Sequence, residues 1–251
     1  MSTLNMNLCW ICKKNEIDSR EHIFKKSLLG KTKNFYHVPL SEKPIVTIQG
    51  PGSNKMKYKA NICAVCNNQL TQGFDMAYDK LYVWFKSKIV KPRIKNILTM
   101  NLSQVFGENY KSTLEDFYCY CAKSLGCRII DAGILLPEDF PNPLTKENLR
   151  TLSISLCLTR PFGYKGGQVE SFVNILGKGD LLGYLQEEGD EVRVLKAIWW
   201  ENIGFLQISY WLGYKPNALF GNELNDNEVV YKIVNTKMDL KKVMKKMRNI
   251  L

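Results

Sequence analysis

Two Cys-x-x-Cys pairs constrain the fold of this chain more than any other feature of its sequence. The first is Cys9-Trp-Ile-Cys12 and the second is Cys63-Ala-Val-Cys66, fifty residues further on. Each pair can supply two thiolates from one tight turn, and two such pairs make the four-thiolate tetrahedral site that zinc prefers. The long gap is tolerable because the entropy cost of closing a loop grows only logarithmically with its length. The sequence therefore predicts a structural zinc site near the N-terminus.

Other interpretations of the cysteines stay open at this point. The two pairs could be unrelated thiols or a redox motif, although the duplicated spacing argues against both. An iron–sulfur cluster has compatible ligand spacing. The remaining thiols show no ligand spacing, and we expect them to be buried as small hydrophobic residues. They are Cys119, Cys121, Cys127 and Cys157.

The residues between and after the pairs predict strands followed by a helix. A short strand is expected around residues 21–24. The β-prone runs 45–48 and 56–59 flank a glycine-rich stretch, which predicts a hairpin. A helix is expected to start near Asn67 and to run to about Val90, because apolar residues recur every three to four positions and Pro92 then stops it.

The rest of the chain carries no motif that indicates chemistry. Leu114 to Gly126 predicts a helix that ends at the glycine. Apolar runs at 192–198 and 203–212 predict strands, and Asp239 is expected to cap a final amphipathic helix. We therefore expect an α+β protein, with an N-terminal zinc-stapled module over residues 1–90 and a mixed α/β accessory domain over residues 91–251.

A family resemblance rests on the order of these motifs. Cys9-x-x-Cys12, then Glu21-His22-Ile23, then Cys63-x-x-Cys66-Asn67 resembles the HNH endonucleases, specifically their zinc-bound four-cysteine branch. The resemblance covers roughly residues 9–80. It implies a ββα-metal fold, in which two strands and a helix surround one catalytic divalent ion.

The resemblance also implies a role for each matched residue. His22 would act as the general base that activates water, while Glu21 and Asn67 would be ligands of a catalytic Mg²⁺ or Mn²⁺ ion. This chemistry is sensible because phosphodiester cleavage needs a base with a near-neutral pKa and an ion that stabilises charge on the phosphate. Adjacent strand residues point to opposite faces, so Glu21 and His22 can share a site only if the strand bends there.

The chain departs from the family pattern at three points. The family commonly has proline three residues after the histidine, where this chain has Lys25. The middle asparagine of the motif, which orients the histidine, has no clean match. Asn61 is the nearest candidate but stands closer to Asn67 than the family spacing predicts. The segment from His22 to Cys63 is also longer than the minimal motif, so the predicted hairpin would be an insertion.

Positive charge concentrated near the N-terminus favours a polyanionic partner. The net charge is +11, and residues 1–110 contain 17 Lys and Arg against 7 Asp and Glu. Basic residues gain free energy by releasing counterions from phosphates. The candidate phosphate contacts are Lys25, Lys26, Lys31 and Lys33. We expect a DNA endonuclease; the alternatives are a zinc finger that binds nucleic acid without catalysis and a nuclease directed at RNA.

The sequence also predicts where in the cell the protein is located. Residues 1–7 lack the charged start and apolar run of a secretory signal, and no apolar stretch reaches the ~18–20 residues of a membrane span. A soluble cytoplasmic protein is expected. By resemblance, HNH modules with accessory domains occur in nucleases of phage defence and mobile elements. The accessory domain would then bind a regulatory partner or form a homodimer.

Overall fold

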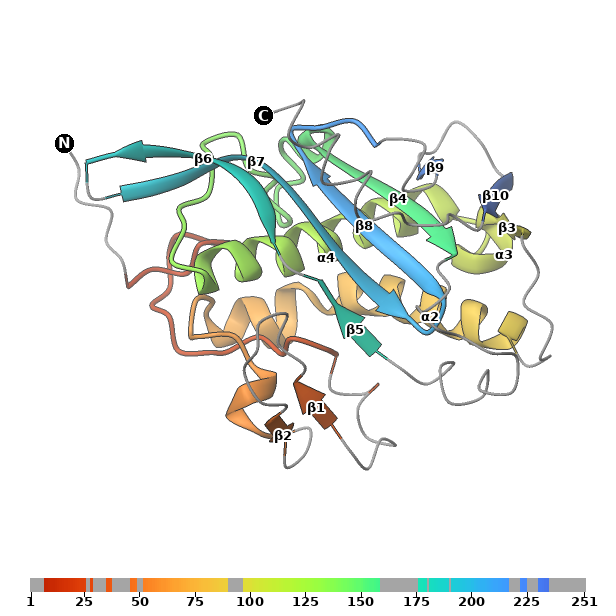
Figure 1. The fold of residues 1–251 in the computed structure, drawn as a ribbon, viewed down its shortest axis with the longest axis horizontal. Coiled ribbons are helices and arrows are strands. Elements are labelled where there is room, and N and C mark those ends of the chain that lie inside the picture. Colours follow the sequence, from red (N-terminus) through yellow and green to blue (C-terminus); the bar gives the residue numbers. More distant parts are fainter. Residues whose placement is uncertain are drawn as a thin grey trace.

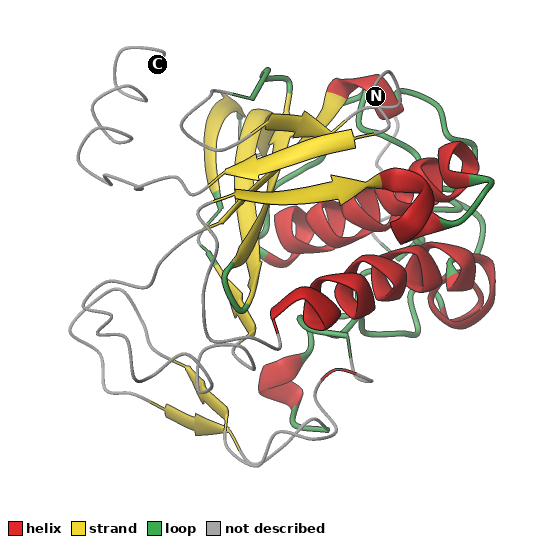
Figure 2. Cartoon of the chain, turned by 90° about the vertical axis from the view of Figure 1, so that its right-hand side faces the viewer, coloured by secondary structure: helices red, strands yellow, loops and turns green. Residues whose placement is uncertain are grey.

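The large sheet and two long helices form the body of the molecule. The computed structural model describes residues 7–25, 28, 35–37, 46–48, 52–89, 97–158, 176–179, 181–189, 191–216, 222–224 and 230–234. Figure 2 shows both long helices on the same side of the sheet. The expected α+β class is therefore confirmed.

The large sheet is antiparallel throughout, with the strand order β5-β7-β8-β4-β9. Its strands are β4 (Leu152–Leu158), β5 (Leu176–Lys178), β6 (Leu182–Glu188), β7 (Glu191–Ile203), β8 (Leu206–Leu212) and β9 (Asn222–Leu224). The long strand β7 pairs with β6 along its first part and with β5 along its last part. Every residue of β4 and β8 is buried, so these two strands form the centre of the sheet.

Helices α2 (Gln72–Ile89) and α4 (Tyr110–Asp131) pack against each other beneath this sheet (Figure 1). Tyr78 of α2 stacks on Tyr120 of α4, with 4.3 Å between the ring centroids. The central part of α4 is buried on all sides, from Cys119 to Cys127. One hydrophobic core therefore combines α2, from the first ninety residues, with α4 and the sheet.

Gly126 lies inside α4 and does not end it, so that prediction is wrong. The physical reason is a close approach by the indole of Trp10. A Cβ atom at position 126 would lie 2.6 Å from two carbon atoms of that ring. The glycine marks a contact between α4 and the first Cys-x-x-Cys turn.

The N-terminal segments pair differently from the predicted hairpin. Strand β2 (Val46–Ile48) pairs with β1 (Phe35–His37). Residues 56–58 pair instead with the segment that carries Glu21 and His22: the N–H of Ile23 donates to the Met56 carbonyl, and the N–H of Tyr58 donates to the Glu21 carbonyl. The predicted strand at 21–24 is thus a short paired segment, and its partner is the chain that enters the second cysteine pair.

The remaining elements are short. They are the 3₁₀ turns η1 (Asn54–Met56) and η3 (Leu149–Thr151), the π-helical turn η2 (Cys66–Leu70), α3 (Leu102–Phe106), and the antiparallel pair β3 (Ile97–Asn101) and β10 (Val230–Val234). The helix predicted from Asn67 to about Val90 is confirmed as η2 followed by α2. The helix predicted after Asp239 lies outside the described residues.

Candidate metal centre and adjoining polar cluster

The first cysteine pair lies on a tight turn closed by backbone hydrogen bonds. The N–H of Cys9 donates to the Asn15 carbonyl, and the N–H of Lys13 donates to the Cys9 carbonyl, both at 2.8 Å. Lys13 has a φ of 52°, in the left-handed region, which turns the chain sharply after Cys12. The turn therefore directs both thiols of the pair to one side.

The second pair lies at the beginning of the helical segment that leads into α2. The N–H of Cys66 donates to the Cys63 Sγ at 3.4 Å, as expected when two cysteines share one turn. Cys66 also begins the π-helical turn η2, whose extra residue per turn is a feature often found at functional sites. Thr71 closes that turn by donating its N–H to the Cys66 carbonyl.

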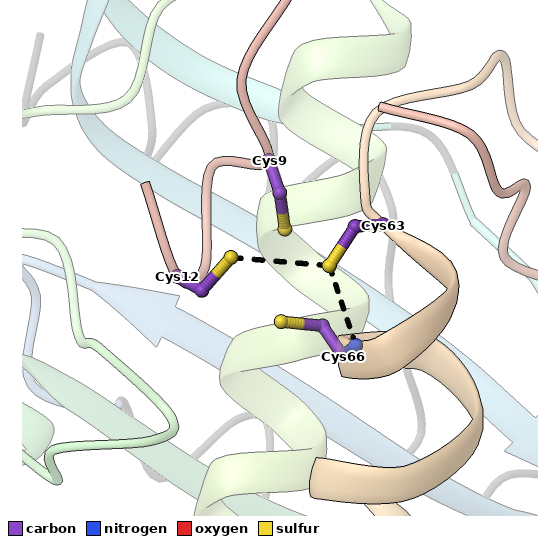
Figure 3. A group of neighbouring side chains, drawn as sticks. All are labelled: Cys9, Cys12, Cys63 and Cys66. Atoms are coloured by element: carbon purple, nitrogen blue, oxygen red, sulfur yellow. Dashed lines mark hydrogen bonds between the residues drawn. The ribbon is translucent and has the colours of Figure 1, made fainter. Parts of the chain in front are cut away.

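The four thiols meet, as the sequence predicted. Their Sγ atoms all lie within 4.8 Å of one another and point toward a common centre (Figure 3). The Sγ atoms of Cys12 and Cys63 are 3.8 Å apart. Tetrahedral zinc with Zn–S bonds of about 2.3 Å requires S···S distances of about 3.8 Å. The cluster therefore has the size and donors to hold a metal such as zinc.

The surroundings of the thiols differ within the cluster. Burial raises the pKa of Cys9 and of Cys66 above the ordinary thiol value. Burial also opposes ionisation of Cys12, but backbone N–H groups of Asn15 and Lys14 outweigh it and lower the pKa of this thiol to about 7. A metal that binds here must displace protons from the buried thiols.

Glu21 and His22 follow the first turn on the paired segment. His22 forms an antiparallel bridge with Lys57, and the chain bends at the next two residues. His22 is half-buried, and its Nε2 atom is fully buried. The Glu21 side chain is directed toward α4, where its Oε2 lies 3.7 Å from the Nζ of Lys123.

The two predicted asparagines occupy different surroundings. Asn67 lies on η2, and its amide nitrogen donates to the Ser19 Oγ at 2.9 Å, so it contacts the segment that carries Glu21 and His22. Asn61 is only 1% exposed and donates to the Cys127 carbonyl of α4 at 3.1 Å. Asn67 is thus brought toward the Glu21–His22 segment, whereas the amide nitrogen of Asn61 is bonded to α4.

A buried lysine ties the Glu21 carboxylate to α2. Lys123 is 1% exposed, and its Nζ lies 2.9 Å from the Asp75 Oδ1 as well as 3.7 Å from Glu21. Burial raises the pKa of Glu21, and the ammonium of Lys123 opposes that shift. Burial acts to lower the pKa of Lys123, but the two carboxylates outweigh it and raise that pKa. The three charged groups carry a net charge of −1 when ionised.

Of the four lysines predicted to contact phosphate, Lys25 is the described one. Its ammonium donates to the Asp75 carbonyl at 2.7 Å and forms an ion pair with Asp79. It therefore joins the Glu21 segment to α2. Lys26, Lys31 and Lys33 lie outside the described residues.

Sequence reasoning did not find Lys123 as part of this cluster. The available signal was a single lysine within Cys121-Ala122-Lys123-Ser124-Leu125, a stretch whose other members suit a helix interior. Buried lysines are nearly always paired with an acid. The sequence therefore indicates that Lys123 pairs with an acidic residue, but it does not identify that residue.

The chain matches no family model, no curated protein and no solved structure. Within the described part of the chain, no helix is long and apolar enough to cross a membrane. The candidate site therefore has to be argued from its own geometry.

Proposed function

We propose that this protein is a metal-dependent endonuclease of the HNH type, in which His22 is the general base. One observation carries the proposal. The segment with Glu21 and His22 runs antiparallel to the segment that enters the second cysteine pair, and a helix follows directly. Two paired segments followed by a helix is the order of elements that the resemblance implies for a ββα-metal fold.

Zinc is the structural metal in this proposal. The four thiols are close together, the spacing of Cys12 and Cys63 suits tetrahedral zinc, and three of the four cysteines are buried. Each pair comes from a different part of the chain, so a zinc ion would cross-link the first turn to the start of η2. A structural role fits a fully thiolate site that leaves no position for substrate.

His22 would remove a proton from the attacking water. Because Nε2 is buried, Nδ1 is the nitrogen that we assign to this step. Glu21 offers a carboxylate and Asn67 an amide oxygen, which are hard donors of the kind that Mg²⁺ and Mn²⁺ prefer. A bound divalent ion would stabilise negative charge on the phosphate and on the leaving oxygen.

DNA is the substrate that we propose, because the excess of positive charge lies in the same part of the chain as the candidate site. The phosphate backbone attracts positive charge whatever the base sequence. RNA carries the same phosphates, so both nucleic acids belong in the test.

The decisive experiment compares His22→Ala with the parent protein and with His37→Ala, the matched change at the other histidine. Each is incubated with supercoiled plasmid and with RNA in Mg²⁺ or Mn²⁺, and zinc is quantified by mass spectrometry. We expect one zinc per chain in all three proteins. We also expect cleavage of plasmid to fall by about 10²–10⁴-fold in His22→Ala alone.

Three outcomes would contradict parts of the proposal. Equal cleavage by His22→Ala and the parent removes His22 as the base. Salt-sensitive DNA binding without cleavage under either ion indicates the non-catalytic zinc finger. Cleavage of RNA with intact plasmid changes the substrate while leaving the chemistry in place.

A further inference from the structure

Lys123 connects α4 to both parts of the proposed site. It comes from outside the first ninety residues, yet its Nζ reaches three acceptors within them: the Asp75 Oδ1 at 2.9 Å, the Thr71 Oγ1 at 3.3 Å and the Glu21 Oε2 at 3.7 Å. The contacts with Asp75 and Thr71 are hydrogen bonds, and the contact with Glu21 is an ion pair. The three acceptors come from the paired segment, from the residue that closes η2 and from α2.

The Thr71 contact extends the connection to the zinc side of the site. The hydroxyl of Thr71 donates to the Cys66 carbonyl at 2.9 Å while it accepts from Lys123. Thr71 also closes the turn that carries Asn67. Lys123 thus touches, directly or through one residue, the segments that hold Glu21 and Asn67.

Packing alone does not account for a charged residue at this position. Lys123 is surrounded along α4 by buried residues, and an ammonium taken out of water needs compensation that an apolar side chain of similar length does not. A second lysine in this region, Lys178, has its own partner, the Glu201 Oε2 at 3.2 Å. In the part of the chain that the structure describes, the ion pair of Glu21 is formed with Lys123.

We infer that Lys123 is a positioning residue of the proposed nuclease, which holds the Glu21 carboxylate and the Asn67 turn in the arrangement that binds the catalytic ion. The inference rests on the proposed function and adds that the site is incomplete without α4. Groups that orient metal ligands from behind commonly change metal affinity or activity by about 10–100-fold when they are removed.

The test separates two effects of Lys123 on cation binding: its positioning of Glu21 and its contribution to the net charge of the cluster. Lys123→Met removes the ammonium and makes the cluster more negative, so charge alone would strengthen cation binding. The double variant Lys123→Met/Asp75→Asn keeps the net charge of the parent and removes the carboxylate that the single variant would leave without its ammonium. Lys146→Met is the matched control, because Lys146 also pairs with two carboxylates of α4, those of Glu115 and Asp116, but does so at the surface.

Mn²⁺ binding to the zinc-loaded full-length chain is measured by the electron paramagnetic resonance signal of free Mn²⁺, beside the Mg²⁺ dependence of plasmid cleavage. We expect the dissociation constant for Mn²⁺ to rise by about tenfold or more in both Lys123 variants and to stay unchanged in Lys146→Met. The Glu21→Gln variant should lose this binding. Turnover should fall in the Lys123 variants with little change in KM for DNA.

The outcomes distinguish the inference from the proposed function. Mn²⁺ binding as tight as in the parent, or tighter, in the charge-matched double variant overturns the positioning role even if the parent cleaves DNA. Absence of Glu21-dependent Mn²⁺ binding in the parent overturns it as well. If binding follows the expected order but no protein cleaves nucleic acid, the proposed function fails while the positioning role of Lys123 stands.

Discussion

Two buried tyrosines illustrate how polar contacts at single residues affect stability. The hydroxyl of Tyr210 donates to the Glu201 carboxylate, in the cluster that also contains Lys178. Tyr58 is 2% exposed, and its hydroxyl oxygen has no hydrogen-bond partner among the described residues. The ring of Tyr58 packs beside the cysteines, so its apolar part stabilises that region whereas its hydroxyl does not.

Replacing each tyrosine by phenylalanine should therefore have different effects on the free energy of unfolding. Tyr210→Phe removes a bond to a charged acceptor and should lower the free energy of unfolding by roughly 1.5–3 kcal/mol. Tyr58→Phe removes a buried hydroxyl without a partner and should leave that free energy unchanged or raise it by up to about 1 kcal/mol. Urea denaturation of both variants measures the difference. A loss for Tyr58→Phe as large as for Tyr210→Phe would contradict the assignment.

Contacts between single residues also explain which parts of the candidate site could be predicted from the sequence and which could not. The cysteine cluster was predictable because its ligand spacing is local: each pair fits within one turn. The contacts of Lys123 were not, because Glu21 is about a hundred residues away in sequence and pairing between such distant residues leaves no local pattern. The hydrogen bond from the Asn61 side-chain amide to the Cys127 carbonyl of α4 could not be predicted for the same reason.

At the scale of elements, two helical glycines offer a matched comparison. Gly73 lies in the first turn of α2, where an added Cβ would meet only the Asp116 carboxylate, at 3.9 Å. Gly126 lies in α4 against the ring of Trp10, where an added Cβ would lie 2.6 Å from ring carbons. Neither glycine has a positive φ, so backbone strain does not distinguish them.

Substitution by alanine should stabilise one helix and destabilise the protein at the other. Gly73→Ala should raise the free energy of unfolding by about 0.5–1 kcal/mol, because alanine loses less backbone entropy on folding. Gly126→Ala should lower it by about 1–3 kcal/mol, because Trp10 must move. Thermal unfolding followed by circular dichroism gives both values. Equal and favourable effects would mean that Trp10 does not pack on α4.

Element prediction succeeded where a long periodic pattern met a strong stop signal. The helical segments η2 and α2, within residues 66–89, have regular apolar spacing, and Pro92 follows soon after them in the sequence. The hairpin prediction was wrong because a β-prone sequence indicates that a segment is extended but does not indicate which other segment it pairs with. Residues 46–48 pair with β1, whereas residues 56–58 pair with the segment that carries Glu21.

At the scale of the whole molecule, the first ninety residues and the rest share one core. Six side chains of α2 are buried in that core: Phe74, Ala77, Tyr78, Leu81, Trp84 and Phe85. Further contacts join the cysteine region to later residues: the Lys59 N–H donates to the Asp131 carboxylate at 2.7 Å, and the thiol of Cys127 packs in the same cluster as Cys9 and Cys66.

A fragment of residues 1–90 should therefore bind zinc without adopting a fixed tertiary structure. Burial of the α2 side chains contributes on the order of 10 kcal/mol, which is comparable with the whole stability of an ordinary domain. Without α4 these side chains face water, and Glu21 loses Lys123. With zinc added, the fragment should bind a dye specific for exposed hydrophobic surface and give poorly dispersed amide signals in nuclear magnetic resonance, unlike the full chain. A monomeric fragment with well-dispersed signals and no dye binding would show that the zinc-bound part folds alone, and α4 would then be an accessory to the site instead of a component of it.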